Sequence, residues 1–272
     1  MASTTPPLLE LERVSKAFRV GGLLSRKLVK ALEDVSLLIG EGEIVALVGE
    51  SGCGKTTTGK LAAGLLKPTS GRVLYRGKDV WSLKGEEFAE YRRSVQIVHQ
   101  DPYSSLNPML TVFRTLSAPL LKHRVVESKE EAVDRVSHIL DLVGLSPPED
   151  FILKYPHQLS GGQRQRVVIA RAMTLNPRLI VADEPVSMID VSLRLSILHL
   201  LLNLRREFSV AYLHITHDLA TAKYFARGFK LAVMYLGSIV ELGPTEEVID
   251  DPLHPYTKAL ISALPEPDPR VT

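Results

Sequence analysis

Two glycine-containing segments of this 272-residue chain have the residue types and spacing of phosphate-binding loops. Residues 49–56 (GESGCGKT) match the pattern G-x-x-x-x-G-K-[ST], in which glycines let backbone N–H groups turn toward phosphates. In that pattern Lys55 reaches the β- and γ-phosphates, and Thr56 places a hydroxyl on Mg²⁺. Residues 159–163 (LSGGQ) form the second segment, in which Ser160 suits a helix N-cap and two glycines leave the backbone open to an anion. The first loop therefore predicts nucleoside triphosphate binding, and the second predicts a further anion site.

A pair of carboxylates follows an apolar run at residues 179–182. Ligands of open α/β folds bind at the carboxyl ends of the strands, where Asp183 and Glu184 would lie. Asp183 would hold Mg²⁺ directly or through water, and Glu184 would polarise the attacking water. Alone, this pair would be an ordinary polar turn after a strand. Beside the phosphate-binding loop, it predicts an ATPase.

The elements that position these residues alternate between strands and helices. A continuous apolar run at 44–48 precedes the first loop, as expected for a strand buried on both faces of a parallel sheet, and a helix follows to about residue 66. Strand character returns at 179–182 and 210–215. This alternation predicts an α/β fold with a mainly parallel sheet and helices on both faces, the P-loop NTPase core.

Two further regions differ from this core. Residues 8–19, 31–40 and 71–81 have strand and hairpin patterns and predict an antiparallel β subdomain, with the basic segment 21–30 as a solvated loop. Residues 101–158 have helical periodicity between proline-rich edges and predict an inserted helical lobe. The predicted organisation is one nucleotide-binding domain over 1–272. It comprises a core with β subdomain at 1–99 and 165–230, a helical signature lobe at 100–164, and an extension at 231–272.

Composition excludes several classes of protein. The chain has 33 lysines and arginines against 31 acidic residues, so no strong field favours nucleic acid or an anionic membrane. Its single cysteine excludes an internal disulfide and a cysteine-based metal cluster, and suits a reducing compartment. No apolar run approaches the ~20 residues of a membrane-spanning helix, so we expect any membrane role to be peripheral.

The chain resembles the ATP-binding cassette (ABC) ATPases, because further motif residues of that family occur in it in the family's order. Gln100 corresponds to the glutamine that senses Mg²⁺ and the attacking water, Asp190 to the loop that crosses the dimer interface, and His217 to the γ-phosphate contact. Phe18 is placed like the aromatic residue that stacks on adenine. Both residues could instead have purely structural roles: Gln100 could simply end a strand, and Phe18 could be an ordinary hydrophobic residue of a hairpin. His214 is expected to be a core residue.

The resemblance implies ATP and Mg²⁺ as cofactors and a head-to-tail dimer with two composite sites. The implied residues are, for catalysis, Glu184, His217 and Gln100; for Mg²⁺, Thr56, Gln100 and Asp183; and for nucleotide binding, Phe18, Gly49, Glu50, Ser51, Gly52, Cys53, Gly54, Lys55, Thr56, Thr57, Ser160, Gly161, Gly162, Gln163 and Asp190.

Within that family, the chain is most similar to the second ATPase subunit of oligopeptide and dipeptide importers. The similarity lies in residues 49–55, 100–108, 183–187, 234–237 and 254–260, and in the insertion 22–27. It implies two membrane-spanning permease subunits, whose coupling helix would enter a groove at 101–109, and a second ABC ATPase subunit as a heterodimer partner, with a homodimer possible in isolation. It also implies an indirect extracytoplasmic solute-binding protein, no nucleic acid, and a peripheral place on the cytoplasmic side of the inner membrane.

Several alternatives stay open. Relatives of this branch carry oligosaccharides or metal ions, so the cargo is not fixed by the chain. A soluble ABC protein acting in DNA repair or translation and a P-loop metabolic kinase are competing functions. Met188 and Ile189 replace the Ala-Leu pair that is usual in the family, which leaves the interface loop uncertain. Members of this branch often continue past a proline-rich stretch like 265–269, and this sequence ends at Thr272, as a natural short form or a truncation.

Overall fold

The computed structural model describes residues 6–20 and 27–263 and divides the chain into two compact units. The terminal unit comprises Met1–Ile39, Glu43–Trp81 and Leu213–Thr272, and the central unit comprises Gly40–Gly42 and Ser82–Tyr212. The insertion at 22–26 and the stretch at 265–269 lie outside the described residues. The predicted division into core, signature lobe and extension remains a prediction.

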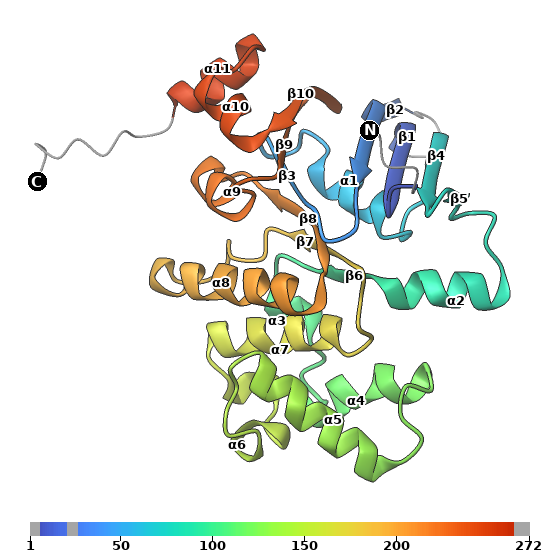
Figure 1. Cartoon of the computed structure of the whole chain (residues 1–272), viewed down its shortest axis with the longest axis vertical. Coiled ribbons are helices and arrows are strands. Elements are labelled where there is room, and N and C mark those ends of the chain that lie inside the picture. The colour runs from blue at the N-terminus through green and yellow to red at the C-terminus, as the bar shows by residue number, and fades with distance from the viewer. Residues whose placement is uncertain (1–5, 21–26, 264–272) are drawn as a thin grey trace, which may run out of the picture. The chain divides into compact units, whose positions relative to one another are not determined.

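One sheet of the terminal unit is antiparallel, with strand order β2-β1-β4-β5 (Figure 1). Its strands are β1 (Leu9–Val20), β2 (Lys27–Ile39), β4 (Ser70–Tyr75) and β5 (Lys78–Asp79). The solvated loop predicted for 21–30 is wrong for its last four residues, because β2 already begins at Lys27 and pairs with β1 from there. Positive charge does not prevent strand formation at a sheet edge, where lysine side chains project into water.

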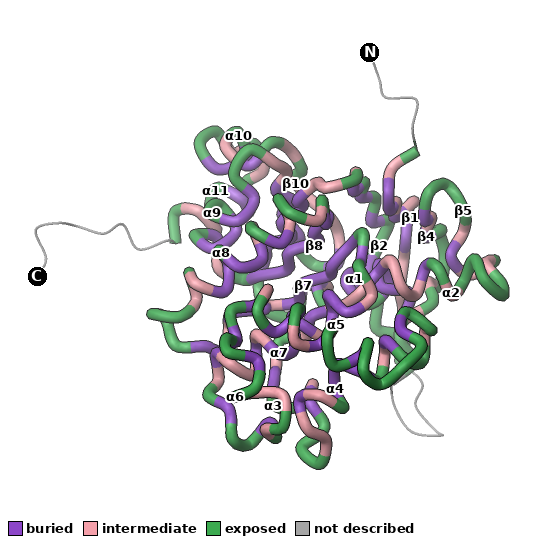
Figure 2. The backbone as a smooth tube through the Cα atoms, turned by 60° about the horizontal axis from the view of Figure 1, so that its bottom comes forward, coloured by how far each residue is buried: buried purple, intermediate pink, exposed green. Residues whose placement is uncertain are grey.

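The second sheet region of the terminal unit has the order β10-β9-β3-β8. These strands are β3 (Ile44–Val48), β8 (Ala211–Thr216, which begins in the central unit), β9 (Lys230–Tyr235) and β10 (Ser238–Pro244). β3 pairs in parallel with β9, and all five of its residues are buried, as its apolar run predicts. Figure 2 shows β8 as buried along its length.

Among its described residues, the terminal unit contains four helices: α1 (Lys55–Ala62), α9 (Leu219–Phe225), α10 (Thr245–Asp250) and α11 (Pro255–Ser262). The prediction that the first of these continues to about residue 66 is wrong. Gly64 adopts φ +62°, and its N–H bonds the carbonyl of Leu61, which closes the helix one turn earlier than Pro68 would. A left-handed glycine just past the last turn is a common helix terminator.

The central unit contains a parallel strand pair and most of the helices. β6 (Val95–Val98) pairs with β7 (Leu179–Asp183), and the helices are α2 (Gly85–Ser94), α3 (Pro102–Ser105), α4 (Val112–Lys122), α5 (Lys129–Leu142), α6 (Glu149–Ile152), the 3-10 helix η1 (Pro156–Gln158), α7 (Gly161–Met173) and α8 (Val191–Phe208). Buried faces of α4, α5 and α7 pack on one another (Figure 1). The helical character predicted for 101–158 and the α/β fold class are confirmed.

Candidate nucleotide site

The phosphate-binding loop lies between β3 and α1, in the terminal unit. Gly54 is the N-cap of α1 with φ +114°, and a Cβ there would lie 2.6 Å from Leu32 Cδ2 and 2.7 Å from the Ala31 carbonyl oxygen. A Cβ on Gly49 would lie 2.2 Å from the Met234 carbonyl oxygen. Both positions therefore require glycine on steric grounds, in addition to the backbone conformation that Gly54 adopts.

Lys55 folds back over this loop. Its side chain is buried, and Nζ donates hydrogen bonds to the carbonyl oxygens of Gly49 (2.7 Å) and Glu50 (2.8 Å). The ammonium group thus lies at the N-terminus of α1, where the helix dipole also favours an anion. Cys53 is buried beside it, and this burial raises the pKa of its thiol, which favours the protonated form at neutral pH. The charge of Lys55 and the helix N-terminus together suit this loop to an anion, and Cys53 is a small packed residue within it.

Two other predicted residues belong to the terminal unit. Phe18 is 38% exposed on β1, with Lys16 Nζ 5.3 Å from its ring centroid, so an aromatic face is accessible for stacking. His217 is exposed directly after β8. His214, three residues earlier, is fully buried, and its ring centroid lies 4.5 Å from that of Phe225. Burial lowers the pKa of His214 to about 4, which confirms the expected core histidine.

The predicted catalytic carboxylate and glutamine meet in the central unit. Gln100 follows β6, Glu184 follows β7, and Gln100 Nε2 donates a 2.8 Å hydrogen bond to Glu184 Oε2. Asp183 ends β7 and is 6% exposed. Glu184 adopts φ +48°, a left-handed conformation that is uncommon for residues other than glycine. Strained backbone of this kind concentrates at functional sites, and here it turns the glutamate away from the strand direction.

The second glycine loop caps α7. The Ser160 hydroxyl accepts the Gln163 N–H (3.3 Å), and Gln163 Oε1 accepts the Ser160 N–H (2.9 Å), which is a capping box. A Cβ on Gly161 would meet nothing within 4 Å, whereas one on Gly162 would lie 3.1 Å from Leu193 Cδ1. Packing against Leu193 therefore explains the glycine at 162. The space beside Gly161 is open, and a group from another molecule could occupy it.

The loop before α8 contains the residues that depart from the family pattern. Ile189 is 6% exposed, whereas Met188 is 57% exposed, so only the isoleucine belongs to the core of this unit. Asp190 occupies the N-cap position of α8 and is exposed without a side-chain capping hydrogen bond. Its carboxylate is thus not used to cap its own helix.

Some residues of the site could not be found from motif reasoning. Tyr256 of α11 contacts the phosphate-binding loop, whereas the segment 254–260 indicates only a family resemblance in the sequence. Arg171 Nη1 donates a 2.6 Å hydrogen bond to the Ser105 carbonyl oxygen and so ties α7 to the end of α3. Neither side chain carries a local sequence signal, because each acts on a segment more than sixty residues away.

In the described ranges 6–20 and 27–263, no helix is both long enough and apolar enough to cross a bilayer. Within the same residues, no group of three or more His, Cys, Asp or Glu side chains is arranged to hold a metal ion by itself.

Comparisons with known proteins agree on the family. The ABC transporter profile matches residues 32–187, and the oligopeptide/dipeptide transporter C-terminal region profile matches residues 240–272. The oligopeptide transport ATP-binding protein OppF of Bacillus subtilis is 43% identical over 97% of this chain and 85% of its own length. The glutathione import ATP-binding protein GsiA of Pectobacterium atrosepticum is 45% identical over 97% of this chain, which spans only 42% of that relative.

A solved structure gives the same result for the fold. The ATP-binding cassette MJ0796, in a dimeric post-hydrolysis state bound to ADP and Pi, is similar with a TM-score of 0.76 and 33% identity, over 87% of this chain and 98% of that one. The predicted P-loop NTPase fold is therefore confirmed. The ABC transporter profile match spans more than half of the chain, and OppF is 43% identical over 97% of it. The chain belongs to the ATP-binding ATPases of the ABC transporter family.

Proposed function

We propose that this chain is the ATP-hydrolysing motor subunit of an importer that carries peptides across the cytoplasmic membrane. The observation that carries the proposal is the Gln100–Glu184 hydrogen bond of 2.8 Å at the ends of two paired parallel strands. It brings a carboxylate base and a polar amide to one edge, where a reacting water can be oriented. The name of the relative GsiA, a glutathione import ATP-binding protein, supports the inward direction of transport, and that of OppF, an oligopeptide transport ATP-binding protein, supports a peptide cargo.

Residues of the chain have separate roles in this reaction. Lys55 and the N–H groups of residues 49–57 bind the phosphates, and Phe18 stacks on the base. Glu184 polarises the attacking water, Gln100 orients it, and His217 contacts the γ-phosphate. Thr56, Gln100 and Asp183 supply the hydroxyl, amide and carboxylate oxygens that suit Mg²⁺, which when bound neutralises phosphate charge.

A second ATPase subunit completes each site. Ser160, Gly161, Gly162 and Gln163 of one subunit would close over ATP held by the other, with Asp190 crossing the interface. The open space at Gly161 and the exposed carboxylate of Asp190 support this proposal, because neither is used inside its own unit. The similar cassette MJ0796 is itself dimeric. Binding of ATP would then close the dimer, and hydrolysis would reopen it.

The permease subunits would dock on the lobe 100–164 and its neighbours. We call the candidate surface the α4 groove; its lining in the central unit includes Phe88, Gln96, Asn107, Leu110, Arg114 and Arg171. Both apolar and polar side chains line this groove, which suits the insertion of a short amphipathic helix. Peripheral attachment to the cytoplasmic face of the membrane would follow from this contact.

Affinity purification from detergent-solubilised native membranes, followed by mass spectrometry, tests the proposal. We expect two multi-span proteins, a second P-loop ATPase and an extracytoplasmic binding protein, whose bound ligand distinguishes peptide from oligosaccharide or metal-ion cargo. Arg114→Glu in the α4 groove should reduce recovery of the multi-span proteins, and Arg124→Glu, exposed outside that groove, should not. Recovery of the chain alone from the soluble fraction, or bound to nucleic acid, would refute the importer function.

A further inference from the structure

The C-terminal helix α11 contacts the phosphate-binding loop. The Tyr256 hydroxyl accepts a 3.1 Å hydrogen bond from the backbone N–H of Glu50, the second residue of the loop. Both residues belong to the terminal unit, although they lie more than two hundred positions apart in the sequence. The hydrogen bond therefore links the last described helix directly to a segment that the proposed function assigns to ATP.

Tyr256 is held in place by its own surroundings. Its ring centroid lies 4.2 Å from that of Tyr235 at the end of β9, with an interplanar angle of 32°. Its N–H donates a 3.1 Å hydrogen bond to His254 Nδ1, the side-chain cap of α11. The Tyr235 ring packs against the phenol and the His254 cap holds the Tyr256 backbone, so the hydroxyl is directed at the loop.

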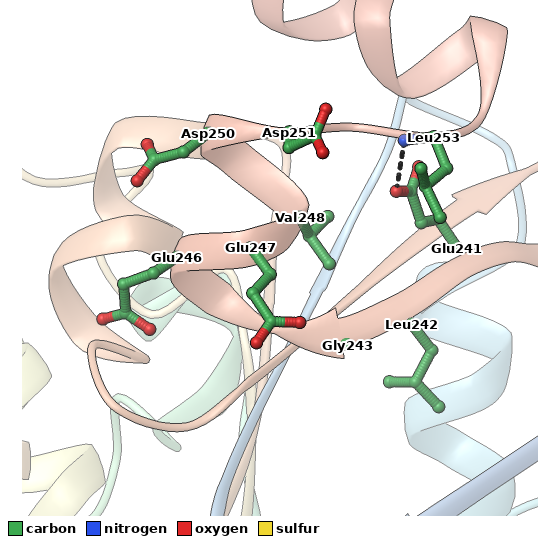
Figure 3. A pocket seen from close by; sticks show the side chains of 9 residues that line it. All are labelled: Glu241, Leu242, Gly243, Glu246, Glu247, Val248, Asp250, Asp251 and Leu253. Carbon is green, nitrogen blue, oxygen red and sulfur yellow. Dashed lines mark hydrogen bonds between the residues drawn. The ribbon is translucent and has the colours of Figure 1, made fainter.

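The start of α11 is tied in turn to β10. The Glu241 carboxylate accepts the N–H of Leu253 at 2.8 Å and the N–H of His254 at 3.0 Å. Figure 3 shows the first of these bonds, between the strand residue and the chain that enters α11. A charged acceptor makes both bonds stronger than neutral ones. A continuous set of contacts therefore runs from β10 through the start of α11 to the loop.

A second hydrogen bond reaches the same loop from the β9–β10 turn. Gly237 N–H donates to the Cys53 carbonyl oxygen at 2.8 Å, and the Gly237 carbonyl accepts the Glu33 N–H at 2.9 Å. Gly237 adopts φ +86°, and a Cβ there would lie 2.9 Å from the Ala31 carbonyl oxygen. The turn is thus shaped to approach the loop closely, independently of Tyr256.

We propose that Tyr256 is a positioning residue for ATP binding, which fixes Glu50 and thereby holds the phosphate-binding loop in its anion-binding conformation. With Tyr235 and Gly237 it forms what we call the C-terminal brace. The proposal rests on the assignment of residues 49–57 to ATP. In this proposal, the position of α11 affects the affinity for ATP. A partner or modification that acts on this helix would therefore change ATP binding without contacting ATP.

The expected change in ATP affinity follows from the loss of one hydrogen bond, that between Tyr256 and Glu50. A net contribution of about 1 kcal/mol corresponds to about a fivefold change in affinity. Because the brace orders the loop before ATP arrives, its loss should weaken binding and leave the chemical step unchanged. The KM for ATP should rise about fivefold while kcat stays the same.

Tyr256→Phe in the full chain removes the hydroxyl and keeps the ring on Tyr235. Two readouts are compared with the unaltered protein: site-resolved hydrogen exchange of the Glu50 amide without nucleotide, and ATP affinity with KM and kcat. Tyr224→Phe, on a partly exposed tyrosine of α9 in the same unit, is the matched control. Glu241→Ala loosens the start of α11 without touching Tyr256 or the loop, and should change both readouts in the same direction.

Faster exchange at Glu50 together with the KM-only effect, in Tyr256→Phe and not in Tyr224→Phe, supports the proposal. Unchanged exchange at Glu50, unchanged ATP affinity, or a drop in kcat equal to the rise in KM would overturn it. Faster exchange throughout the chain would also overturn it, because it indicates a merely structural role. Failure of the unaltered protein to bind ATP would refute the proposed function instead, and exchange at Glu50 would still decide whether the brace holds the loop.

Discussion

Ser160 has two roles that a single substitution separates. Its hydroxyl caps α7 by accepting the Gln163 N–H, and Ser160 is proposed to close over the ATP held by the partner subunit. Aspartate is as good an N-cap as serine, but it carries a negative charge. Ser160→Asp should therefore preserve the helix and abolish the composite site.

The two effects differ in size and sign. Loss of the cap in Ser160→Ala should destabilise the protein by about 1 kcal/mol. Ser160→Asp should retain that stability, because the first turn of α7 has no acidic residue and a new charge gains about 0.3–1 kcal/mol from the helix dipole. Against a phosphate about 4 Å away, however, the same charge is repelled by roughly 4 kcal/mol at an effective dielectric constant of 20. That repulsion corresponds to about a thousandfold loss of ATP-driven closure.

Two assays read these effects separately: urea unfolding for the cap, and ATPase activity with ATP-dependent dimerisation for the site. Ser128 provides a matched control, because it caps α5 by the same geometry, with the Glu131 N–H 3.1 Å from its hydroxyl, and belongs to no proposed site. Ser128→Asp should leave stability and ATPase activity nearly unchanged.

ATPase activity within about twofold of the unaltered protein in Ser160→Asp would refute the composite site, since a charge facing phosphate cannot be neutral to it. Loss of stability in Ser160→Asp as large as in Ser160→Ala would refute the capping argument. Inactivation by Ser128→Asp as well would show that charge at any helix start of this unit disturbs the protein, and the comparison would lose its specificity.

Two further predictions concern the terminal unit. His214 should make stability fall as pH drops, because its pKa is about 4 when folded and near 6.5 when unfolded, so the unfolded chain binds the proton first. About 2 kcal/mol of the free energy of unfolding should be lost between about pH 8 and 5. Urea unfolding midpoints should show this pH dependence in the unaltered protein and not in His214→Leu. An equal pH dependence in that variant would contradict the assignment. Gly54→Ala, whose Cβ would lie 2.6 Å from Leu32 Cδ2, should abolish measurable ATP binding in equilibrium titration, whereas Gly52→Ala, whose Cβ meets nothing within 4 Å, should weaken it less. Equal losses would show that backbone conformation alone, rather than contact, limits residue 54.

Local patterns were sufficient to predict the elements that carry the chemistry. The apolar runs at 44–48 and 179–182 form β3 and β7, because a strand buried on both faces leaves a continuous hydrophobic signal. Ser160 predicts the start of α7, because an N-cap interaction lies within four residues of the chain. Motif order then supplied the family.

Long-range contacts could not be predicted in this way. The first residues of β2 are a strand because β1 pairs with them, and their own charges suggest a loop. The left-handed φ of +48° at Glu184 could not be predicted, because the residue is not a glycine. The contact between Tyr256 and the loop joins two segments that are far apart in the sequence and come together only in the folded chain. In each case the cause is tertiary, and a local window of sequence does not contain it.

The central claim is that Glu184 activates the water that attacks ATP, and Glu184→Gln tests it most directly. The substitution keeps the shape of the side chain and an acceptor near Gln100, and removes the carboxylate base. We predict that ATP hydrolysis falls by about 10²–10⁴-fold while Mg-ATP affinity stays within about twofold. Glu207→Gln, on the exposed end of α8, should leave both unchanged. Retained hydrolysis in Glu184→Gln, or loss of ATP binding in its place, would contradict the account.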